Sequence, residues 1–253
     1  MGQSLTHDAF LGGRLHIWQP KRGYRAGMDP VLLAASIPAR AGQTVLDLGC
    51  GVGTAALCLA TRVPGLSLTG VEVQPDYADL ARRNANEAKL PLDVVTADLR
   101  ALPGSVSARS FDHVLTNPPY FQRAQGTESD DAGRETAMGE EVPFAVWLDA
   151  AIKRVRPGGT LTVIQRMGRL PEALAAIGSR LGACEVLPIT GRPQQHAETF
   201  LLHAVKGRRT PFRLCPPLVT HQGESHRGDR EHYTAPLMNV LRNAAAMPGY
   251  PNS

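Results

Sequence analysis

A glycine turn at residues 47–53 carries residue types that could hold a charged cofactor. The segment reads Asp-Leu-Gly-Cys-Gly-Val-Gly, and its glycines allow a tight turn and a close approach of the backbone to a ligand. The spacing is G-x-G-x-G, and Thr54 stands where a dinucleotide fingerprint needs its third glycine. A carboxylate in this turn would repel a pyrophosphate, but it suits a ligand with an ammonium and a sulfonium group. The turn therefore predicts an S-adenosylmethionine site at Asp47, Gly49, Gly51 and Gly53.

Two further acids follow the turn at the ends of predicted strands. Glu72 lies about 20 residues after the glycines, the usual spacing for an acid that binds ribose hydroxyls. Asp98 follows the next predicted strand and could accept a hydrogen bond from the amino group of adenine. Either acid alone could equally be a solvated residue at a strand end. The glycine turn alone could also belong to a dinucleotide site or be a tight connection without a ligand. Their common register with Asp47 favours the cofactor site.

The segment Asn117-Pro118-Pro119-Tyr120 ends another predicted strand. Two prolines stiffen the backbone and lack N–H donors, which leaves two acceptors, the side-chain oxygen of Asn117 and the carbonyl of Pro118. Acceptors that grip both hydrogens of a planar amino or amide nitrogen favour a tetrahedral nitrogen with a localised lone pair, which can attack a sulfonium methyl group in line. Tyr120 would stack on the plane of the target. The alternative is a rigid turn without chemistry.

The elements that must position these segments alternate along the chain. Strands are predicted at 44–48, 66–73, 92–96, 111–116, 160–165, 185–189 and 199–205, and helices at 29–37, 54–63, 75–90, 144–155, 170–181 and 235–246. This order predicts a Rossmann-like α/β fold, a mostly parallel seven-stranded sheet with helices on both faces and a C-terminal antiparallel hairpin at an edge. Ligands bind beyond the carboxyl ends of such strands, so both segments should face one crevice. Phe144 and Trp147, on the helix at 144–155, are expected in the core.

The totals fit one domain of 253 residues, with an N-terminal extension (1–28), a catalytic core (29–207) and a C-terminal extension (208–253). The net charge of +4 is compatible with a nucleic-acid partner without requiring one. The four cysteines form no C-x-x-C pair or cluster with histidine, which argues against a metal site and fits a reducing cytoplasm. We see no signal peptide and no apolar stretch long enough to span a membrane.

These motifs resemble those of the class I methyltransferases, and within them the N-methyltransferases whose fourth strand ends in Asn-Pro-Pro-Tyr. The chain is most similar to the bacterial enzymes that methylate N6 of the adenine after the anticodon of a valine tRNA. The likeness includes residues 27–33, 134–137 (Arg-Glu-Thr-Ala) and 232–234 (His-Tyr-Thr). The resemblance implies that Met28 and Asp29 contact S-adenosylmethionine, that Arg134 lies in a substrate loop, and that tRNA is the partner.

The residues leave the substrate open between an adenine in RNA and a glutamine amide in a protein, because release-factor methyltransferases share Asn-Pro-Pro-Tyr. Those enzymes usually carry a separate N-terminal helical domain, for which too few residues precede the first strand here. A cofactor-binding RNA module without catalysis is the third possibility. Arg22 and Arg25 are candidate substrate contacts, and further candidates for phosphate binding are Lys21, Lys206, Arg208, Arg209 and Arg213.

Overall fold

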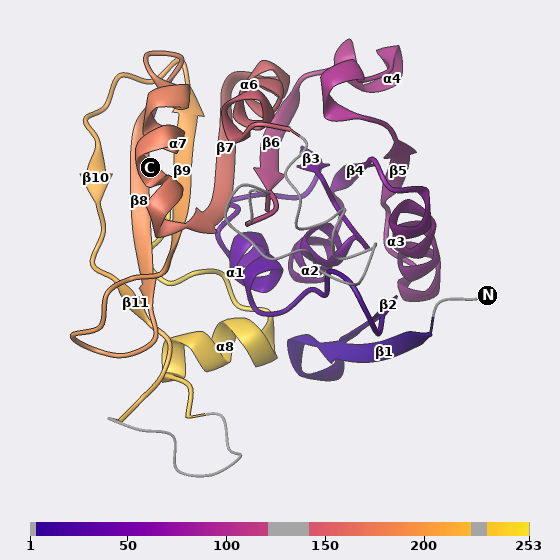
Figure 1. Ribbon diagram of the computed structural model, residues 1–253, viewed down its shortest axis with the longest axis horizontal. Coiled ribbons are helices and arrows are strands. Elements are labelled where there is room, and N and C mark those ends of the chain that lie inside the picture. Colours follow the sequence, from indigo (N-terminus) through magenta and orange to yellow (C-terminus); the bar gives the residue numbers. More distant parts are fainter. Residues whose placement is uncertain (1–3, 121–141, 224–231, 253) are drawn as a thin grey trace.

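The computed structural model describes residues 4–120, 142–223 and 232–252. In these ranges the central sheet has nine strands in the order β10-β8-β9-β7-β6-β3-β4-β5, with β11 also paired to β8 (Figure 1). Its strands are β3 (Thr44–Leu48), β4 (Ser67–Glu72), β5 (Asp93–Thr96), β6 (Phe111–Thr116), β7 (Val155–Arg166), β8 (Leu181–Thr190), β9 (Thr199–Lys206), β10 (Arg213–Leu214) and β11 (Leu218–Val219). A separate hairpin consists of β1 (Leu5–Phe10) and β2 (Leu15–Pro20).

The strands from β3 to β7 are parallel, and β9 is antiparallel to both of its neighbours, β7 and β8. This confirms the predicted mostly parallel α/β sheet with a late antiparallel pair. The predicted place of the antiparallel strand at an edge is wrong, because β9 lies inside the sheet. Seven of its eight residues are buried, so this strand needs a partner on each side and cover on both faces. The two short strands β10 and β11 then extend the sheet beyond β8, both parallel to it.

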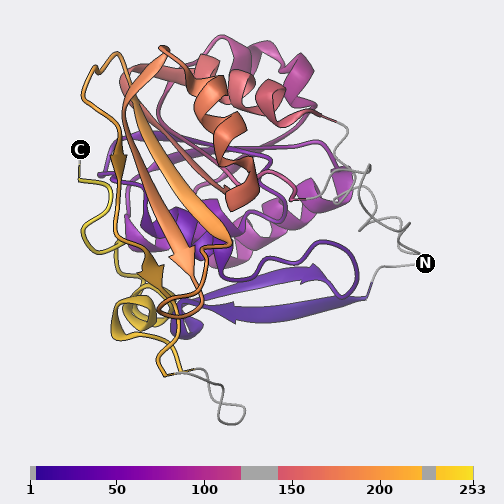
Figure 2. The ribbon, with the colours of Figure 1, turned by 60° about the vertical axis from the view of Figure 1, so that its left-hand side comes forward.

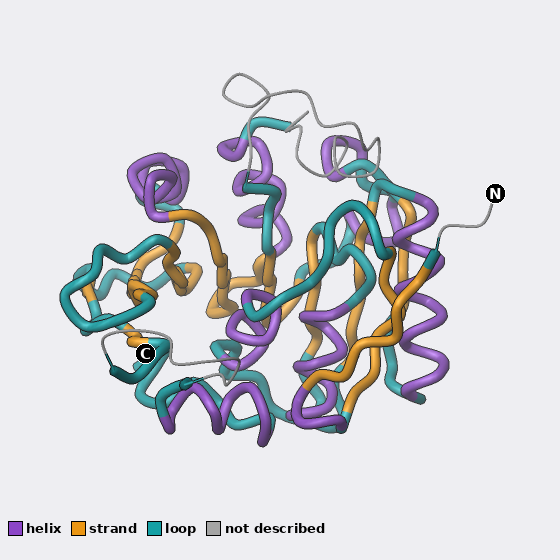
Figure 3. The backbone as a smooth tube through the Cα atoms, turned by 60° about the horizontal axis from the view of Figure 1, so that its bottom comes forward, coloured by secondary structure: helices purple, strands orange, loops and turns teal. Residues whose placement is uncertain are grey.

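Helices cover both faces of the sheet (Figures 1 and 3). Neighbouring strand residues point to opposite faces, so Val45 and Leu115 join one apolar cluster with α1, α2 and α3, while Leu46 and Val114 join another with α6 and α7. No helix among the described residues is both long and apolar enough to cross a membrane. The helices are α1 (Asp29–Ala35), α2 (Thr54–Arg62), α3 (Pro75–Ala88), α4 (Gly104–Ser107), α6 (Phe144–Arg154), α7 (Leu170–Ile177) and α8 (Ala235–Asn243).

Two predicted boundaries moved for local reasons. The helix predicted at 170–181 ends at Ile177, because Gly178 has a φ of +50° and cannot continue it; Leu181 already begins β8. The strand predicted at 160–165 begins earlier, at Val155, so that Pro157-Gly158-Gly159 lies within β7. A register shift opposite this segment, between Phe111 and His113 of β6, lets the strand pair on both sides of it.

The terminal segments pack together below the sheet, where Figure 2 shows the hairpin (indigo) beside α8 (yellow). Leu15 and Ile17 of the hairpin and Leu237 of α8 belong to the same apolar cluster as α1 and α2. Further along, the backbone N–H of Met247 donates to the carbonyl of Ala35 at the end of α1 (2.8 Å). Both termini therefore contribute to the core that supports one face of the sheet.

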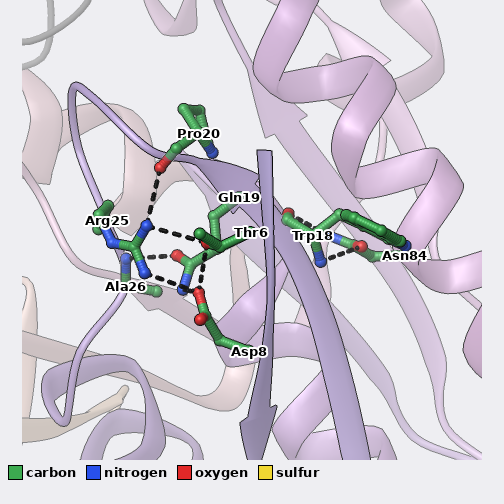
Figure 4. A network of polar contacts seen from close by, with 8 residues as sticks. All are labelled: Thr6, Asp8, Trp18, Gln19, Pro20, Arg25, Ala26 and Asn84. Carbon is green, nitrogen blue, oxygen red and sulfur yellow. Dashed lines mark hydrogen bonds and ion pairs between the residues drawn. The ribbon is translucent and has the colours of Figure 1, made fainter. Parts of the chain in front are cut away.

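A buried asparagine joins the hairpin to α3 (Figure 4). Asn84 accepts from the backbone N–H of Trp18 (2.8 Å) and donates to the carbonyls of Trp18 and Val52 (3.0 Å each). On the other side of the same hairpin, Asp8 accepts from the Gln19 amide and from the Arg25 guanidinium, both at 2.8 Å. The bond from Arg25 to Asp8 fixes the hairpin against the chain segment that leads into α1.

We expect Asn84→Ala to lower the free energy of unfolding by about 2–3 kcal/mol, because it removes the side-chain partner of three backbone groups, one buried at Val52 and two partly buried at Trp18. The measurement is urea denaturation followed by circular dichroism. Asn86→Ala is the matched control: it lies in the same helix with an exposed side chain, and should change the free energy by less than about 0.5 kcal/mol. Equal losses in the two variants would contradict the bridging role of Asn84.

Candidate active site

A pocket opens at the carboxyl ends of four neighbouring strands. Gly51 follows β3, Glu72 ends β4, Asp98 follows β5 and Asn117 follows β6, and all four line the pocket. These residues are far apart in sequence and meet because the four strands are parallel and adjacent. The two segments singled out by sequence therefore border one cavity.

The glycine turn has a backbone that only glycine adopts readily. Gly49, Gly51 and Gly53 have φ angles of +78°, +55° and +86°. The N–H groups of Gly49 and Cys50 both donate to the carbonyl of Val71 in β4 (2.8 and 2.9 Å), which folds the turn against the next strand. A Cβ atom on Gly49 would lie 2.5 Å from the Trp147 ring. The turn is thus shaped by close approach to α6 as well as by its own conformation.

Glu72 ties the glycine turn to the end of β4. One carboxylate oxygen accepts the N–H of Gly51 (2.8 Å) and the other accepts the N–H of Gln74 (2.9 Å). Burial raises the pKa of this carboxyl, while the backbone bonds oppose that shift. Glu72 therefore presents a partly desolvated, rigidly held carboxylate to the pocket.

The other two acids have different settings. Asp47 is 2% exposed and does not line the pocket; its carboxylate accepts the N–H of Ala56 in the first turn of α2 (3.2 Å). Burial raises the pKa of Asp47 to about 7. Asp98 lines the pocket and forms an ion pair with Arg100 (2.5 Å), and the hydrogen bonds from Arg100 lower its pKa. Asp98 is therefore charged at neutral pH.

The Asn-Pro-Pro-Tyr turn is held by side chains from elsewhere in the chain. The Asn117 amide nitrogen donates to the hydroxyl of Tyr24 (3.2 Å), while no described residue donates to its amide oxygen. Gln165, at the end of β7, donates to the carbonyls of Pro118 (3.2 Å) and Pro119 (3.4 Å). Asn117 and Pro119 line the pocket, so the turn contributes to its wall.

Tyr120 is anchored through its hydroxyl. It donates to the Asp29 carboxylate at 2.5 Å, and burial together with this carboxylate raises the pKa of Tyr120, so the hydroxyl stays protonated. The guanidinium of Arg166 lies over the Tyr120 ring, 5.0 Å from its centroid. Asp29 and Met28 were expected at the cofactor, but neither lines this pocket; Met28 packs against the apolar cluster around α1.

Sequence reasoning missed three residues of the site, Tyr24, Trp147 and Gln165. Tyr24 lines the pocket, and burial of its hydroxyl raises its pKa. Trp147 was predicted in the core together with Phe144; Phe144 is buried, but Trp147 lines the pocket and donates from its indole N–H to Thr116 (2.6 Å). The sequence pattern of an amphipathic helix does not show which of its aromatic residues faces a cavity. The sequence around Tyr24 and Gln165 likewise carries no motif that indicates a role in the site.

The candidate basic residues do not gather at this pocket. Arg22 is exposed and has no ion pair within the described residues, whereas the guanidinium of Arg25 is bound to Asp8, Thr6 and the Pro20 carbonyl (Figure 4). Lys206 ends the antiparallel strand β9 and donates to the carbonyls of Ile152 and Val155 near the start of β7, at the end of the strands opposite the pocket. Arg134 lies outside the described residues. Among the described residues, no three histidine, cysteine or acidic side chains are placed to bind a metal.

We expect Gly49→Ala to lower the free energy of unfolding by about 1–3 kcal/mol more than Gly158→Ala does, because it adds a clash with Trp147 to the same backbone strain. Gly158 is the matched control, since its φ of +74° resembles the +78° of Gly49 while its Cβ would meet open space. Thermal and urea unfolding of both variants would measure the difference. Equal free energies of unfolding would show that the Trp147 contact does not constrain the turn.

The chain matches the family model of the methyltransferase small domain over residues 27–192. It is 30% identical over 252 residues to a tRNA1(Val) (adenine(37)-N6)-methyltransferase of Porphyromonas gingivalis, covering 85% of this chain and 96% of the relative. A protein of the same name from Shewanella baltica is 30% identical over 205 residues, covering 77% of this chain and 84% of the relative.

Solved structures show the same architecture. A predicted O-methyltransferase from Agrobacterium tumefaciens superposes with a TM-score of 0.69 at 28% identity, covering 86% of this chain and 97% of that one. A 16S rRNA N2 G1207 methyltransferase from Thermus thermophilus, in complex with AdoMet and guanosine, superposes with a TM-score of 0.57 at 22% identity, covering 81% and 51% of the two chains. The resemblance drawn from the motifs is confirmed: the chain belongs to the methyltransferase small domain family and is an S-adenosylmethionine-dependent methyltransferase.

Proposed function

We propose that the protein transfers a methyl group from S-adenosylmethionine to the N6 amino group of an adenine in tRNA. The observation that carries this proposal is that Asn117 lines the pocket while its amide oxygen accepts no hydrogen bond from a described residue. The relatives named as tRNA adenine-N6 methyltransferases supply the substrate class.

S-adenosylmethionine would supply an electrophilic methyl group on a sulfonium. The pocket suits such a ligand, because the glycine turn lacks Cβ atoms at its wall and Glu72 offers a fixed carboxylate for ribose hydroxyls. We assign Asp98 to the adenine amino group. Asp47, buried behind the turn, favours a cationic ligand, since a nearby positive charge stabilises its ionised form. Met28 and Asp29 remain proposed cofactor contacts.

The Asn-Pro-Pro-Tyr turn would act on the target nitrogen by orientation and charge stabilisation. The Asn117 oxygen and the second lone pair of the Pro118 carbonyl accept the two amino hydrogens, which favours a tetrahedral nitrogen with a localised lone pair. These oxygens would stabilise the positive charge that develops on the nitrogen as it takes up the methyl group, until the methylated nitrogen releases a proton to water. The Tyr120 ring, whose hydroxyl is bound to Asp29 and over which Arg166 lies, would stack on the base.

Contacts to RNA are proposed for Arg22, Arg25 and Arg134. Arg22 is exposed two residues before the pocket residue Tyr24, so it can reach a phosphate close to the target. Arg25 is partly neutralised by Asp8 and would offer less to a phosphate. We also propose a cytoplasmic location, which the cysteines led us to expect and which fits a tRNA substrate.

We further propose that residues 1–253 form a single domain, in which the extensions 1–28 and 208–253 support the core 29–207. The support is the shared apolar cluster, to which Leu15 from the first segment and Leu237 from the last both belong.

The function is tested by incubating the protein with labelled S-adenosylmethionine and unmodified tRNA. We expect 6-methyladenine in one tRNA species, located by mass spectrometry of its nucleosides and fragments, and absent from that tRNA in a strain lacking the protein. If no tRNA acquires 6-methyladenine, the proposed function is wrong, and a label found on a protein glutamine instead would identify the other planar nitrogen.

Asn117→Ala should lower kcat by about 100-fold or more, because one transition-state acceptor is lost. The affinity for S-adenosylmethionine, measured by calorimetry, should change by less than about threefold, since the lost group acts on the target. Tyr24→Phe is the control: it removes the same Asn117–Tyr24 hydrogen bond but leaves the acceptor oxygen, so its loss in kcat should stay below about tenfold. Comparable losses of kcat in both variants would assign the effect to the shared bond.

A further inference from the structure

We propose that Gln165 is a positioning residue for methyl transfer, which holds the carbonyl of Pro118 in place as an acceptor for the target amino group. This inference rests on the proposed function. It concerns a residue outside the Asn-Pro-Pro-Tyr segment that contacts neither cofactor nor target in the proposed arrangement. Gln165 lies at the end of β7, beside the strand that carries the turn.

The contacts of Gln165 use both ends of its amide. Its nitrogen donates to the carbonyls of Pro118 (3.2 Å) and Pro119 (3.4 Å), and its oxygen accepts the backbone N–H of Arg166 (2.8 Å). The side chain is fully buried, with 0% of its surface exposed. A buried amide is costly unless its polar atoms are paired, so this geometry is tightly specified.

The turn needs such a donor because its own backbone cannot supply one. Two consecutive prolines have carbonyls but no N–H groups, so they donate no backbone hydrogen bond that could fix this stretch. The neighbouring side chains of the turn are held at their tips, Asn117 by Tyr24 and Tyr120 by Asp29. Gln165 is the described side chain that donates to the proline carbonyls between them.

The bond also leaves the carbonyl usable. A carbonyl oxygen has two lone pairs, so the Pro118 oxygen can accept from Gln165 with one and from a target amino group with the other. Catalysis by preorganised acceptors is sensitive to displacements of the order of 1 Å. The same glutamine orders the backbone of Arg166, whose guanidinium lies over Tyr120, and so couples the acceptor to the stacking ring.

The test compares Gln165→Met with Gln43→Met in the full-length protein acting on the same unmodified tRNA. Gln165→Met keeps the shape but removes the donor, and should lower kcat by about tenfold or more, while KM for tRNA and the affinity for S-adenosylmethionine change by less than about threefold. Gln43 is a half-buried glutamine just before β3, at the amino ends of the strands and away from the pocket, where it bonds Arg40 and His113, so its loss costs stability without touching the turn.

Gln165→Glu provides a signature that a merely structural role would not produce. A protonated carboxyl can donate to the Pro118 carbonyl, whereas an ionised one can only accept and repels it. Burial raises the pKa of such a carboxyl, so the kcat of Gln165→Glu relative to the natural protein should recover as the assay pH falls from about 8 to about 6. The ratio for Gln165→Met should stay level over the same range.

The outcomes separate this inference from the function on which it rests. No 6-methyladenine from the natural protein would contradict the proposed function itself. An active natural protein with an unimpaired Gln165→Met variant, or with equal losses in kcat for Gln165→Met and Gln43→Met, would overturn the positioning role alone. A flat pH ratio for Gln165→Glu would overturn it as well.

Discussion

The active site depends on the contact between the glycine turn and the indole ring of Trp147. Gly49 comes so close to this ring that a Cβ atom would lie 2.5 Å from it, and the indole N–H donates to Thr116, the residue before Asn117. Through Thr116, whose hydroxyl also donates to the carbonyl of Leu48, the ends of β3 and β6 and the helix α6 form one rigid unit. The proposed cofactor wall and the proposed methyl acceptor site are therefore fixed relative to each other, which in-line transfer requires.

The Asn-Pro-Pro-Tyr turn shows the consequence of a backbone without donors. Because the two prolines cannot form hydrogen bonds through nitrogen, the turn is held by Tyr24, Asp29 and Gln165, from the segment before α1, from α1 itself and from β7. The terminal hairpin contributes indirectly. Asn84 binds it to α3, and the Asp8–Arg25 ion pair holds the residue that follows Tyr24. A distant hairpin thus helps to set the position of an active-site hydroxyl.

Much of the fold followed from local pattern. Apolar strand runs alternating with helices predicted the parallel sheet, because each such strand must be covered on both faces. The place of β9 did not follow, since its pairing on both sides depends on which distant strands leave an edge free. The same holds for β10 and β11, two-residue strands that exist only as partners of β8. The end of α7 could have been predicted from the sequence, because glycine commonly ends helices and Gly178 follows the last helical residue.

The sequence by itself determined the chemistry, since G-x-G-x-G after a strand, acids at the next strand ends and Asn-Pro-Pro-Tyr specify backbone shapes and acceptors by residue type. Only the tertiary structure decided which other residues complete the site. Tyr24, Trp147 and Gln165 have ordinary types in ordinary patterns, and they matter because folding places them against the two motifs. Folding likewise placed Asp29 against the hydroxyl of Tyr120 and Lys206 at the end of the strands opposite the pocket. Residue type and spacing encode local geometry, whereas contacts between distant segments arise from the packing of the whole chain.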